Sequence, residues 1–288
     1  SIDEKHHIRK HAAFLDNQTL QVGDSIVEAK TVVIATGSSP TIMPKFAELG
    51  DRLIVNDDIF NWETLPESVA VFGPGVIGLE LGQALHRLGV RIRLFGRSGS
   101  LKPLTDTGIR DYAVKVFQEE FPLDAKANVL GMERNGEQVM IRFVDREDGV
   151  EKNENFDYVL AATGRSPNVK DFGLENTTLD LDSRGVPIFD PVTMQCGDSS
   201  IFIAGDANNV LPLLHEAADE GLIAGDNAGR FPELKPGLRR SPLSIVFSDP
   251  QIAMVGQAWS ELEGQENVVV GKISFESQGR SRVMLKNK

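Results

Sequence analysis

The tripeptide Ala-Thr-Gly occurs twice in the chain, at residues 35–37 and 162–164, and a glycine-rich stretch at residues 73–78 lies between the copies. Each copy follows an apolar run and is itself followed, three residues later, by a proline. This pattern predicts a buried strand that stops abruptly, where a flat ligand can approach the backbone. A glycine loop bracketed by two such strand ends favours a chain that holds two nucleotides near each other.

The glycine-rich stretch lies between segments of different hydrophobic period. Residues 69–72 form an apolar run typical of a strand, and residues 77–88 repeat apolar side chains at helical spacing. Residues 90–94 then alternate between apolar and polar side chains, as in a second strand. The sequence therefore predicts a β-α-β unit with the glycine loop at its first turn, which is the context that dinucleotide binding requires.

Each glycine of the loop has a physical role in this interpretation. Gly73 makes the tight turn, Gly75 lets a pyrophosphate approach the backbone, and Gly78 allows the helix and strand to pack closely. The helix N-terminus, at Val76 and Ile77, presents free N–H groups and partial positive charge to the phosphates. The alternative is a glycine-rich turn that binds no ligand.

The choice between NAD and NADP depends on the end of the second strand. NAD sites place an acidic residue there, but the sequence has Gly96 followed by Arg97, which can face a 2′-phosphate and favours NADP. The third glycine of the loop, Gly78, favours NAD, because alanine at this position is typical of NADP sites. The alternative to a phosphate contact is that Arg97 is an ordinary surface residue. Glu80 is a candidate carboxylate near the nicotinamide or a first-turn acid favoured by the helix dipole. Gly164 is assigned to the same nucleotide.

Charge and cysteine content exclude several classes of function. A formal net charge of −12 argues against a nucleic-acid partner, because phosphate attraction needs a basic surface. No apolar run is long enough to span a bilayer, so no membrane partner is expected. Cys196 is the single cysteine and cannot form a disulfide within the chain. A cytoplasmic location is expected, and no metal site is predicted.

The remaining sequence predicts two meanders and a second nucleotide region. Residues 7–28 and 127–156 read as antiparallel meanders, and the second has hairpin signals at Asn135-Gly136 and Asp148-Gly149. Residues 31–35 read as a central strand covered on both faces, and residues 41–65 as connecting chain. A buried strand at 201–204, a helix from about 213 to 228 and short β segments from 242 onward follow.

The order of these pieces resembles the pyridine nucleotide–disulfide oxidoreductases, most closely their dihydrolipoamide dehydrogenase branch. The resemblance rests on residues 73–82, 203–206 and 214–217. It implies an α/β, Rossmann-like flavoprotein fold with two dinucleotide sites and β-meanders, truncated at both ends. It also implies four parts: residues 1–65 as a remnant of the FAD domain, 66–165 as the NAD(P) domain, 166–240 as the FAD and central region, and 241–288 as the start of a dimer interface domain.

The resemblance assigns FAD to a second set of residues. In the family a Gly-Asp pair binds FAD through its Asp, which carries over to Gly205 and Asp206. The next helix points its N-terminus at the flavin, which here involves Leu213, Leu214 and His215; a helix N-terminus stabilises the negative charge of a reduced flavin. A turn cap at Asp206 and an ordinary surface histidine at His215 are the alternatives. The first Ala-Thr-Gly copy is assigned to the flavin side through Thr36 and Gly37.

The chain departs from the family pattern in three ways. An FAD-pyrophosphate loop before residue 30, the Cys-x4-Cys pair and the C-terminal His-Glu pair are all missing from the sequence. We therefore expect a piece of a longer protein, rather than a degenerate family member, that cannot turn over dihydrolipoamide unaided and contains no catalytic residue.

The parent that the resemblance implies is a homodimeric, FAD-dependent oxidoreductase. It is expected to move hydride between NAD or NADP and FAD, and to pass electrons to or from a small-molecule dithiol or another acceptor. A flavin-dependent NAD(P)H reductase or oxidase without the disulfide step, and a nucleotide-binding module without redox chemistry, are the alternatives.

Overall fold

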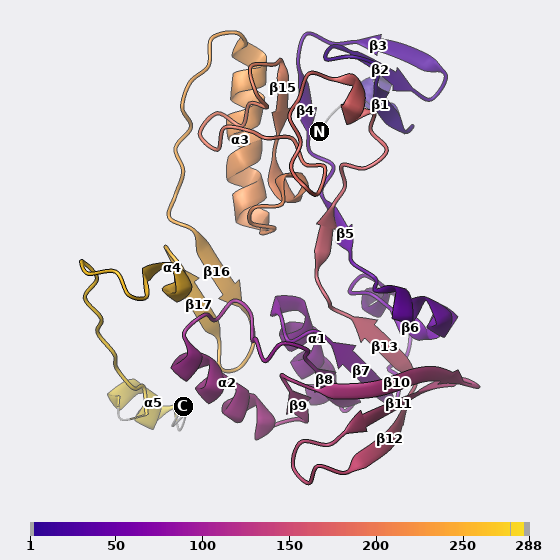
Figure 1. Ribbon diagram of the computed structural model, residues 1–288, viewed down its shortest axis with the longest axis vertical. Coiled ribbons are helices and arrows are strands. Elements are labelled where there is room, and N and C mark those ends of the chain that lie inside the picture. The colour runs from indigo at the N-terminus through magenta and orange to yellow at the C-terminus, as the bar shows by residue number, and fades with distance from the viewer. Residues whose placement is uncertain (1–2, 277, 285–288) are drawn as a thin grey trace. The chain divides into compact units, whose positions relative to one another are not determined.

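The computed structural model describes residues 3–276 and 278–284 (Figure 1). The chain forms two compact units. The first consists of Ser1–Ser39 and Arg165–Arg240, and the second of Pro40–Gly164 and Ser241–Lys288. Each unit is thus assembled from two separate stretches of sequence. The assignment of parts of the chain to FAD, NAD(P) and interface domains stays a prediction.

The second unit is built on a parallel sheet of five strands, counted over the described residues, in the order β6-β13-β7-β8-β9. The predicted β-α-β unit is confirmed as β7, α1 and β8. The sheet and its two helices comprise β6 (Leu53–Ile54), β7 (Ser68–Phe72), α1 (Val76–Arg87), β8 (Arg91–Phe95), α2 (Thr107–Gln118), β9 (Leu123–Asp124) and β13 (Tyr158–Ala161).

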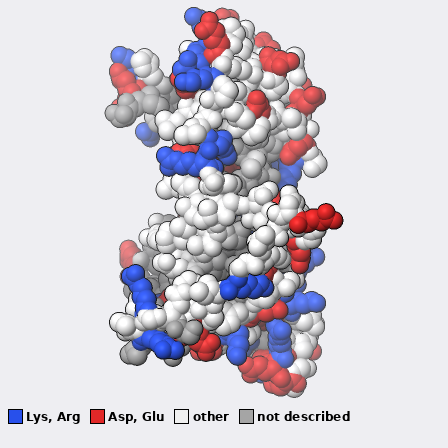
Figure 2. Space-filling view, turned by 90° about the vertical axis from the view of Figure 1, so that its left-hand side faces the viewer, with Lys and Arg blue, Asp and Glu red and all other residues white. Residues whose placement is uncertain are grey.

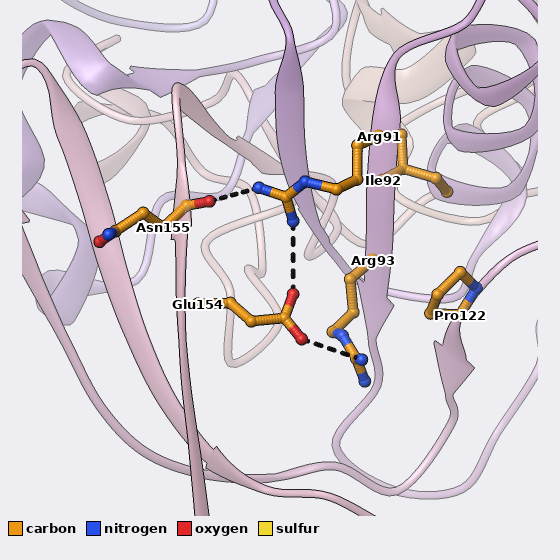
Figure 3. Close-up of a pocket in the computed structure, with 6 residues that line it drawn as sticks. All are labelled: Arg91, Ile92, Arg93, Pro122, Glu154 and Asn155. Atoms are coloured by element: carbon orange, nitrogen blue, oxygen red, sulfur yellow. Dashed lines mark hydrogen bonds and ion pairs between the residues drawn. The ribbon is translucent and has the colours of Figure 1, made fainter.

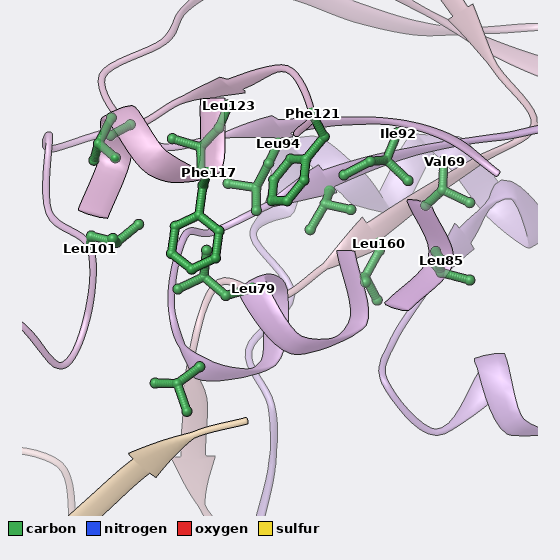
Figure 4. Packing of buried hydrophobic residues seen from close by; sticks show 14 of the residues in the cluster. Val69, Leu79, Leu85, Ile92, Leu94, Leu101, Phe117, Phe121, Leu123 and Leu160 are labelled. Atoms are coloured by element: carbon green, nitrogen blue, oxygen red, sulfur yellow. The ribbon is translucent and has the colours of Figure 1, made fainter. Parts of the chain in front are cut away.

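Successive side chains of β7 point to opposite faces of the sheet and contribute to two separate cores, one on each face. Val69 and Val71 face a cluster that includes side chains of α1 and α2, and Figure 4 shows Leu79 and Phe117 in this cluster. Ala70 and Phe72 face the other cluster, which includes side chains of the second meander. All five residues of β7 are buried, as expected for a strand covered on both faces.

The second meander is an antiparallel sheet whose two turns lie where the sequence predicts them. Gly136 and Gly149 both have positive φ, which hairpin turns of this kind require. The meander and the remaining elements of the unit are η2 (Pro44–Arg52), η3 (Asp58–Asn61), β10 (Asn128–Asn135), β11 (Gln138–Val144), β12 (Glu151–Phe156), β16 (Leu243–Val246), β17 (Ile252–Val255), α4 (Trp259–Leu262) and α5 (Gly279–Val283).

The first unit holds the first meander and a parallel pair of strands, β15 and β4, against which α3 packs. Ile201 and Ile203 contribute to one core cluster, whereas Phe202 contributes to another with Ile223 and Ala224 of α3. Its elements are η1 (Glu4–His6), β1 (Ala12–Phe14), β2 (Thr19–Val22), β3 (Ser25–Glu28), β4 (Val32–Ile34), β5 (Ser38–Pro40), β14 (Arg165–Pro167), η4 (Leu174–Asn176), β15 (Ile201–Ile203), η5 (Gly205–Asn208) and α3 (Leu214–Arg230).

Two predictions about local structure were wrong, and one helix was not predicted. The strand at 31–35 is not covered on both faces, because Val33 in β4 is 38% exposed and β4 pairs only with β15 among the described strands. Residues 41–65 are more than connecting chain: Phe46 and Leu49 are fully buried, and β6 extends the parallel sheet. The sequence interpretation also missed α2.

The surface and the helices bear on the expected partners. On the face shown in Figure 2, acidic side chains are interspersed with basic ones. Among the described residues, no helix combines the length and apolar character that crossing a bilayer requires.

Candidate functional site

The glycine loop connects β7 to α1 in the second unit. Gly73 has a φ of +111°, and a Cβ at this position would overlap the carbonyl oxygen of Ala162. A Cβ at Gly78 would overlap the carbonyl oxygen of Gly73. The turn and the close packing of helix on strand therefore explain both glycines without a ligand. Their assignment to nucleotide binding stays a prediction.

Gly75 has no such internal explanation. Its φ of −99° and ψ of −172° are accessible to any residue. Apart from its chain neighbours, no heavy atom of the described residues lies within 4 Å of the position of its Cβ. Gly75 is also the N-cap of α1, and no side chain of the described chain caps the helix there. The open space and the uncapped first turn at Val76 and Ile77 fit a pyrophosphate.

Glu80 has a partner inside the protein. Its Oε1 accepts a hydrogen bond of 2.8 Å from the backbone N–H of Phe247. One turn later, Gln83 donates to the carbonyl oxygen of Asp249 at 2.8 Å and accepts from the N–H of Asp249 at 2.7 Å. Together these bonds hold the segment after β16 against α1. The role of Glu80 beside the nicotinamide stays a prediction.

The loop after β8 is hydrogen-bonded to the end of β9 and to the loop that follows β9. The N–H of Gly96 donates to the carbonyl oxygen of Asp124 at 2.6 Å, and the N–H of Ala127 donates to that of Gly96 at 2.8 Å. A side chain at Gly96 would overlap the backbone of Ala125, which explains why no acid stands there. Arg97 is exposed at this strand end, as a 2′-phosphate contact requires.

In the first unit, Asp206 is held by two residues that the sequence interpretation did not connect with it. Its Oδ2 accepts a hydrogen bond of 2.6 Å from Oγ of Ser38 and lies 3.9 Å from Nε of Arg165. Arg165 also donates from Nε to Oγ of Ser38 at 2.7 Å. Ser38 and Arg165 each directly follow an Ala-Thr-Gly copy, and that shared position is the signal that could have identified them.

The threonines of the two Ala-Thr-Gly copies have parallel roles. The hydroxyl of Thr36 donates to the carbonyl oxygen of Asn168 at 2.5 Å, and that of Thr163 donates to the carbonyl oxygen of Thr41 at 2.8 Å. Both threonines thus form hydrogen bonds to other segments of the same chain. A flavin-side role for Thr36 stays a prediction.

The glycines of the two copies are alike as well. Gly37 and Gly164 both have positive φ and open space where a Cβ would stand, counted over the described residues. Positive φ favours glycine at both positions whether or not a ligand is present. Ligand contacts by Gly37 and Gly164 therefore stay predictions.

The start of α3 is open, as the flavin assignment needs. Leu213 is the N-cap, and no side chain in the described part of the chain caps the helix there. Leu214 is 88% exposed and His215 is also exposed. An uncapped helix N-terminus with an exposed apolar side chain fits a ligand that is both flat and electron-rich. The contacts of Leu213, Leu214 and His215 with FAD stay predictions.

Cys196 lies in the core of the first unit. It is fully buried, and burial raises the pKa of its thiol to about 12. Because the thiolate is the reactive form, this cysteine is inert near neutral pH.

A cavity of about 450 Å³ lies elsewhere in the second unit, at the start of β8 (Figure 3). Oε2 of Glu154 lies 3.4 Å from Nη1 of Arg91, and its Oε1 lies 3.0 Å from Nη2 of Arg93. Nη2 of Arg91 also donates to the carbonyl oxygen of Asn155 at 2.5 Å. Arg91 pairs in register with Ser68, the first residue of β7, whereas the glycine loop follows the other end of that strand. The cavity is therefore separate from the glycine loop. Its lining also includes Ile92 and Pro122.

Comparison with curated proteins finds relatives that are identical to this chain at just under a third of the aligned positions. A dihydrolipoyl dehydrogenase of Chlamydia pneumoniae is 31% identical over 89% of this chain and 54% of its own length. A mercuric reductase of Staphylococcus aureus is 31% identical over 86% of this chain and 45% of its own length. The chain thus spans about half the length of these relatives.

Solved structures agree on the fold. The HOCl-induced flavoprotein disulfide reductase RclA of Escherichia coli matches with a TM-score of 0.78 at 20% identity, over 97% of this chain and 63% of its own. LpdA of Mycobacterium tuberculosis matches with a TM-score of 0.69 at 28% identity, over 85% of this chain and 52% of its own.

The family model described as pyridine nucleotide-disulphide oxidoreductase matches residues 2–221. Proteins of this kind use FAD and NAD(P)H, the cofactors expected from the sequence. The match covers most of the chain and includes the glycine loop, both Ala-Thr-Gly copies and the Gly-Asp pair. The chain belongs to the pyridine nucleotide-disulphide oxidoreductase family.

Proposed function

We propose that the chain is the nucleotide-binding part of an FAD-dependent oxidoreductase that transfers hydride between NAD(P)H and FAD. Its parent is proposed to resemble dihydrolipoyl dehydrogenase, to act on a small-molecule dithiol and to be a cytoplasmic homodimer. A dihydrolipoyl dehydrogenase and a mercuric reductase match at the same 31% identity, but the match covers more of the dihydrolipoyl dehydrogenase, 54% of its length against 45%, which supports this choice.

The observation that carries the nicotinamide side of the proposal is the environment of Gly75. Space that no described side chain fills lies directly before the uncapped N-terminus of α1. A pyrophosphate there accepts hydrogen bonds from the first-turn N–H groups and is stabilised by the helix dipole. Arg97 at the end of β8 supports NADP over NAD, since its guanidinium can pair with a 2′-phosphate.

Asp206 and the N-terminus of α3 support the FAD part of the proposal. Asp206 offers a fixed carboxylate that can accept hydrogen bonds from ribityl hydroxyls. The partial positive charge at the N-terminus of α3 stabilises negative charge on a ligand. When bound, FAD supplies the two-electron chemistry, and the residues of this chain orient the cofactors and stabilise the charge that develops.

The dithiol step is assigned to residues outside this chain. Cys196 is the single cysteine of the sequence, it is buried, and its thiol has a raised pKa. A cysteine pair cannot be formed from these 288 residues. We therefore propose that the chain alone does not turn over dihydrolipoamide.

A second candidate function is reduction of an acceptor directly by flavin, without a disulfide. The residues of this chain are compatible with it, because such a reductase or oxidase needs no reactive cysteine and Cys196 is buried. The two candidates differ in whether the parent protein carries a cysteine pair that is reduced along with the flavin.

The test uses the purified chain loaded with FAD and kept anaerobic. Addition of NADPH or NADH is expected to bleach the visible absorbance of the flavin, and addition of dihydrolipoamide is expected to leave it unchanged. Failure of both nucleotides to bleach a bound flavin would contradict the proposed function. Bleaching by dihydrolipoamide would contradict the assignment of the dithiol step to residues outside the chain.

A further inference from the structure

A buried carboxylate of α3 lies directly behind the Gly-Asp pair. Glu220 is 1% exposed, the least of the buried charged residues described in this unit. Its Oε2 accepts hydrogen bonds from the N–H of Gly205 at 2.8 Å and from Nδ2 of Asn208 at 2.6 Å. Its Oε1 accepts from Nη1 of Arg239 at 2.9 Å. Three donors therefore satisfy this carboxylate, and Arg239 offsets the cost of burying its charge.

The two groups that Glu220 holds stand on either side of Asp206 in the sequence. Gly205 has a φ of +68°, and the position of its Cβ lies 3.2 Å from Cβ of Ala217, so the turn is tight against α3. Asn208 is 4% exposed, and its Oδ1 accepts from the N–H of Val210 at 2.9 Å. Glu220 thus restrains η5 both before and after Asp206.

Glu216 offers a contrast one turn earlier on α3. Glu216 is 6% exposed, and its Oε2 lies 3.3 Å from Nη2 of Arg239, so Glu216 and Glu220 share one guanidinium. The described hydrogen bonds connect Glu216 to Arg239 and not to η5. The two glutamates therefore have similar burial and a common partner, and they differ in contact with the turn that carries Asp206.

We propose that Glu220 is a positioning residue for the flavin site: it fixes the Gly205–Asn208 turn and thereby sets the direction in which Asp206 presents its carboxylate to FAD. This inference rests on the proposed FAD role of Asp206. Replacing Glu220 by glutamine keeps the volume but removes the charge and directs an amide donor toward other donors. The Asp206 carboxylate then keeps its contacts with Ser38 and Arg165, while the backbone of its turn is released.

The experiment is a fluorescence titration of FAD with the full chain and its variants. Glu220→Gln is expected to weaken FAD binding by about tenfold, as for loss of hydrogen bonds to a charged group. The control variant Glu216→Gln removes the charge of a similarly buried carboxylate that also contacts Arg239, and it is expected to change FAD affinity by less than about twofold. In the Asp206→Asn background, Glu220→Gln is expected to cause little further loss, because it acts through Asp206.

The outcomes separate the inference from the proposed function. An unmodified chain that does not bind FAD would contradict the proposed function, and the inference with it. An unmodified chain that binds FAD, with equal losses in Glu220→Gln and Glu216→Gln or additive losses with Asp206→Asn, would overturn the positioning role alone. If Glu220→Gln does not fold, Asn208→Ala removes one arm of the same restraint. It is then expected to weaken FAD binding by a factor of about three, and unchanged affinity would overturn the proposal.

Discussion

Oγ of Ser38 donates a hydrogen bond of 2.6 Å to Oδ2 of Asp206, across 168 positions of sequence. Arg165 completes the arrangement, since its Nε lies 2.7 Å from the same hydroxyl oxygen. Residues that follow the two Ala-Thr-Gly copies therefore meet the carboxylate of the Gly-Asp pair within the first unit. The three motifs form one hydrogen-bonded network.

The first prediction tests this network through stability. Ser38→Ala removes a donor to a partly buried carboxylate and is expected to lower the free energy of unfolding of the first unit by about 1–2 kcal/mol. Urea unfolding measures the change. Ser39→Ala is the matched control, because the hydroxyl of the exposed Ser39 donates to the Asn168 side chain instead of to Asp206. An equal loss in both variants would contradict a special role for Ser38.

The second prediction concerns the core under the glycine loop. Phe117 of α2 is fully buried in the cluster that also contains Leu79 of α1. Phe117→Ala is expected to cost about 3–5 kcal/mol of unfolding free energy, because it leaves a cavity in a packed core. Phe60→Ala, at a site that is 77% exposed, is the control and is expected to cost little. Chemical denaturation of both variants checks the difference, and similar losses would contradict the importance of this core.

Local patterns predicted the parts of the fold that a short stretch of sequence determines. The β7–α1–β8 unit and the two hairpin turns depend on periodicity and on glycines within a few residues. The helix α2 was missed although Asp106 caps it, accepting from the N–H of Ile109 at 2.9 Å. Its β-branched and aromatic residues do not favour a helix by propensity, and packing on the sheet stabilises it instead.

The site was predictable only in pieces. Gly75 and Asp206 belong to local motifs and could be selected from the sequence. Ser38 and Arg165 share the position directly after an Ala-Thr-Gly copy, which marks them in the sequence but does not show that both contact Asp206. Glu220 binds Gly205 and Asn208 from the following helix, and no spacing rule predicts those contacts. The two-residue strand β6 was missed for the same reason, because its pairing with β13 is non-local.

The third prediction concerns acid pH. The Arg87 guanidinium, with help from Gln83, holds the pKa of Glu120 below its ordinary value. Because the folded-state pKa is lowered, ionised Glu120 stabilises the fold above the ordinary glutamate pKa of about 4.3. That contribution is lost as the pH falls through the lowered pKa. The stability difference between the unmodified chain and Glu120→Gln is therefore expected to be greatest near neutral pH and to shrink on acidification.

Unfolding measured from neutral to acid pH checks this dependence. The exposed Glu63 provides the control for the substitution itself, and Glu63→Gln is expected to change the free energy of unfolding little. A Glu120→Gln difference that grows as the pH falls would contradict the sign of the pKa shift.

The fourth prediction concerns the choice of nicotinamide nucleotide. Arg97→Ala removes the exposed cation at the end of β8 and is expected to weaken NADPH binding about tenfold while leaving NADH binding nearly unchanged. Calorimetric titration with each nucleotide measures the ratio, with Lys115→Ala on α2 as a control for loss of one positive charge. Equal losses for both nucleotides would show that Arg97 does not read the 2′-phosphate.

The most direct test of the central claim is NADPH titration of the unmodified chain and Gly75→Val. Valine is compatible with the backbone angles and the local packing at Gly75, so the variant is expected to keep the circular dichroism spectrum of the unmodified chain. Gly131→Val, in β10 of the same unit, controls for the substitution itself. We expect loss of NADPH binding by at least about tenfold in Gly75→Val alone. Unchanged affinity in a folded Gly75→Val chain would contradict the claim that this loop seats a pyrophosphate.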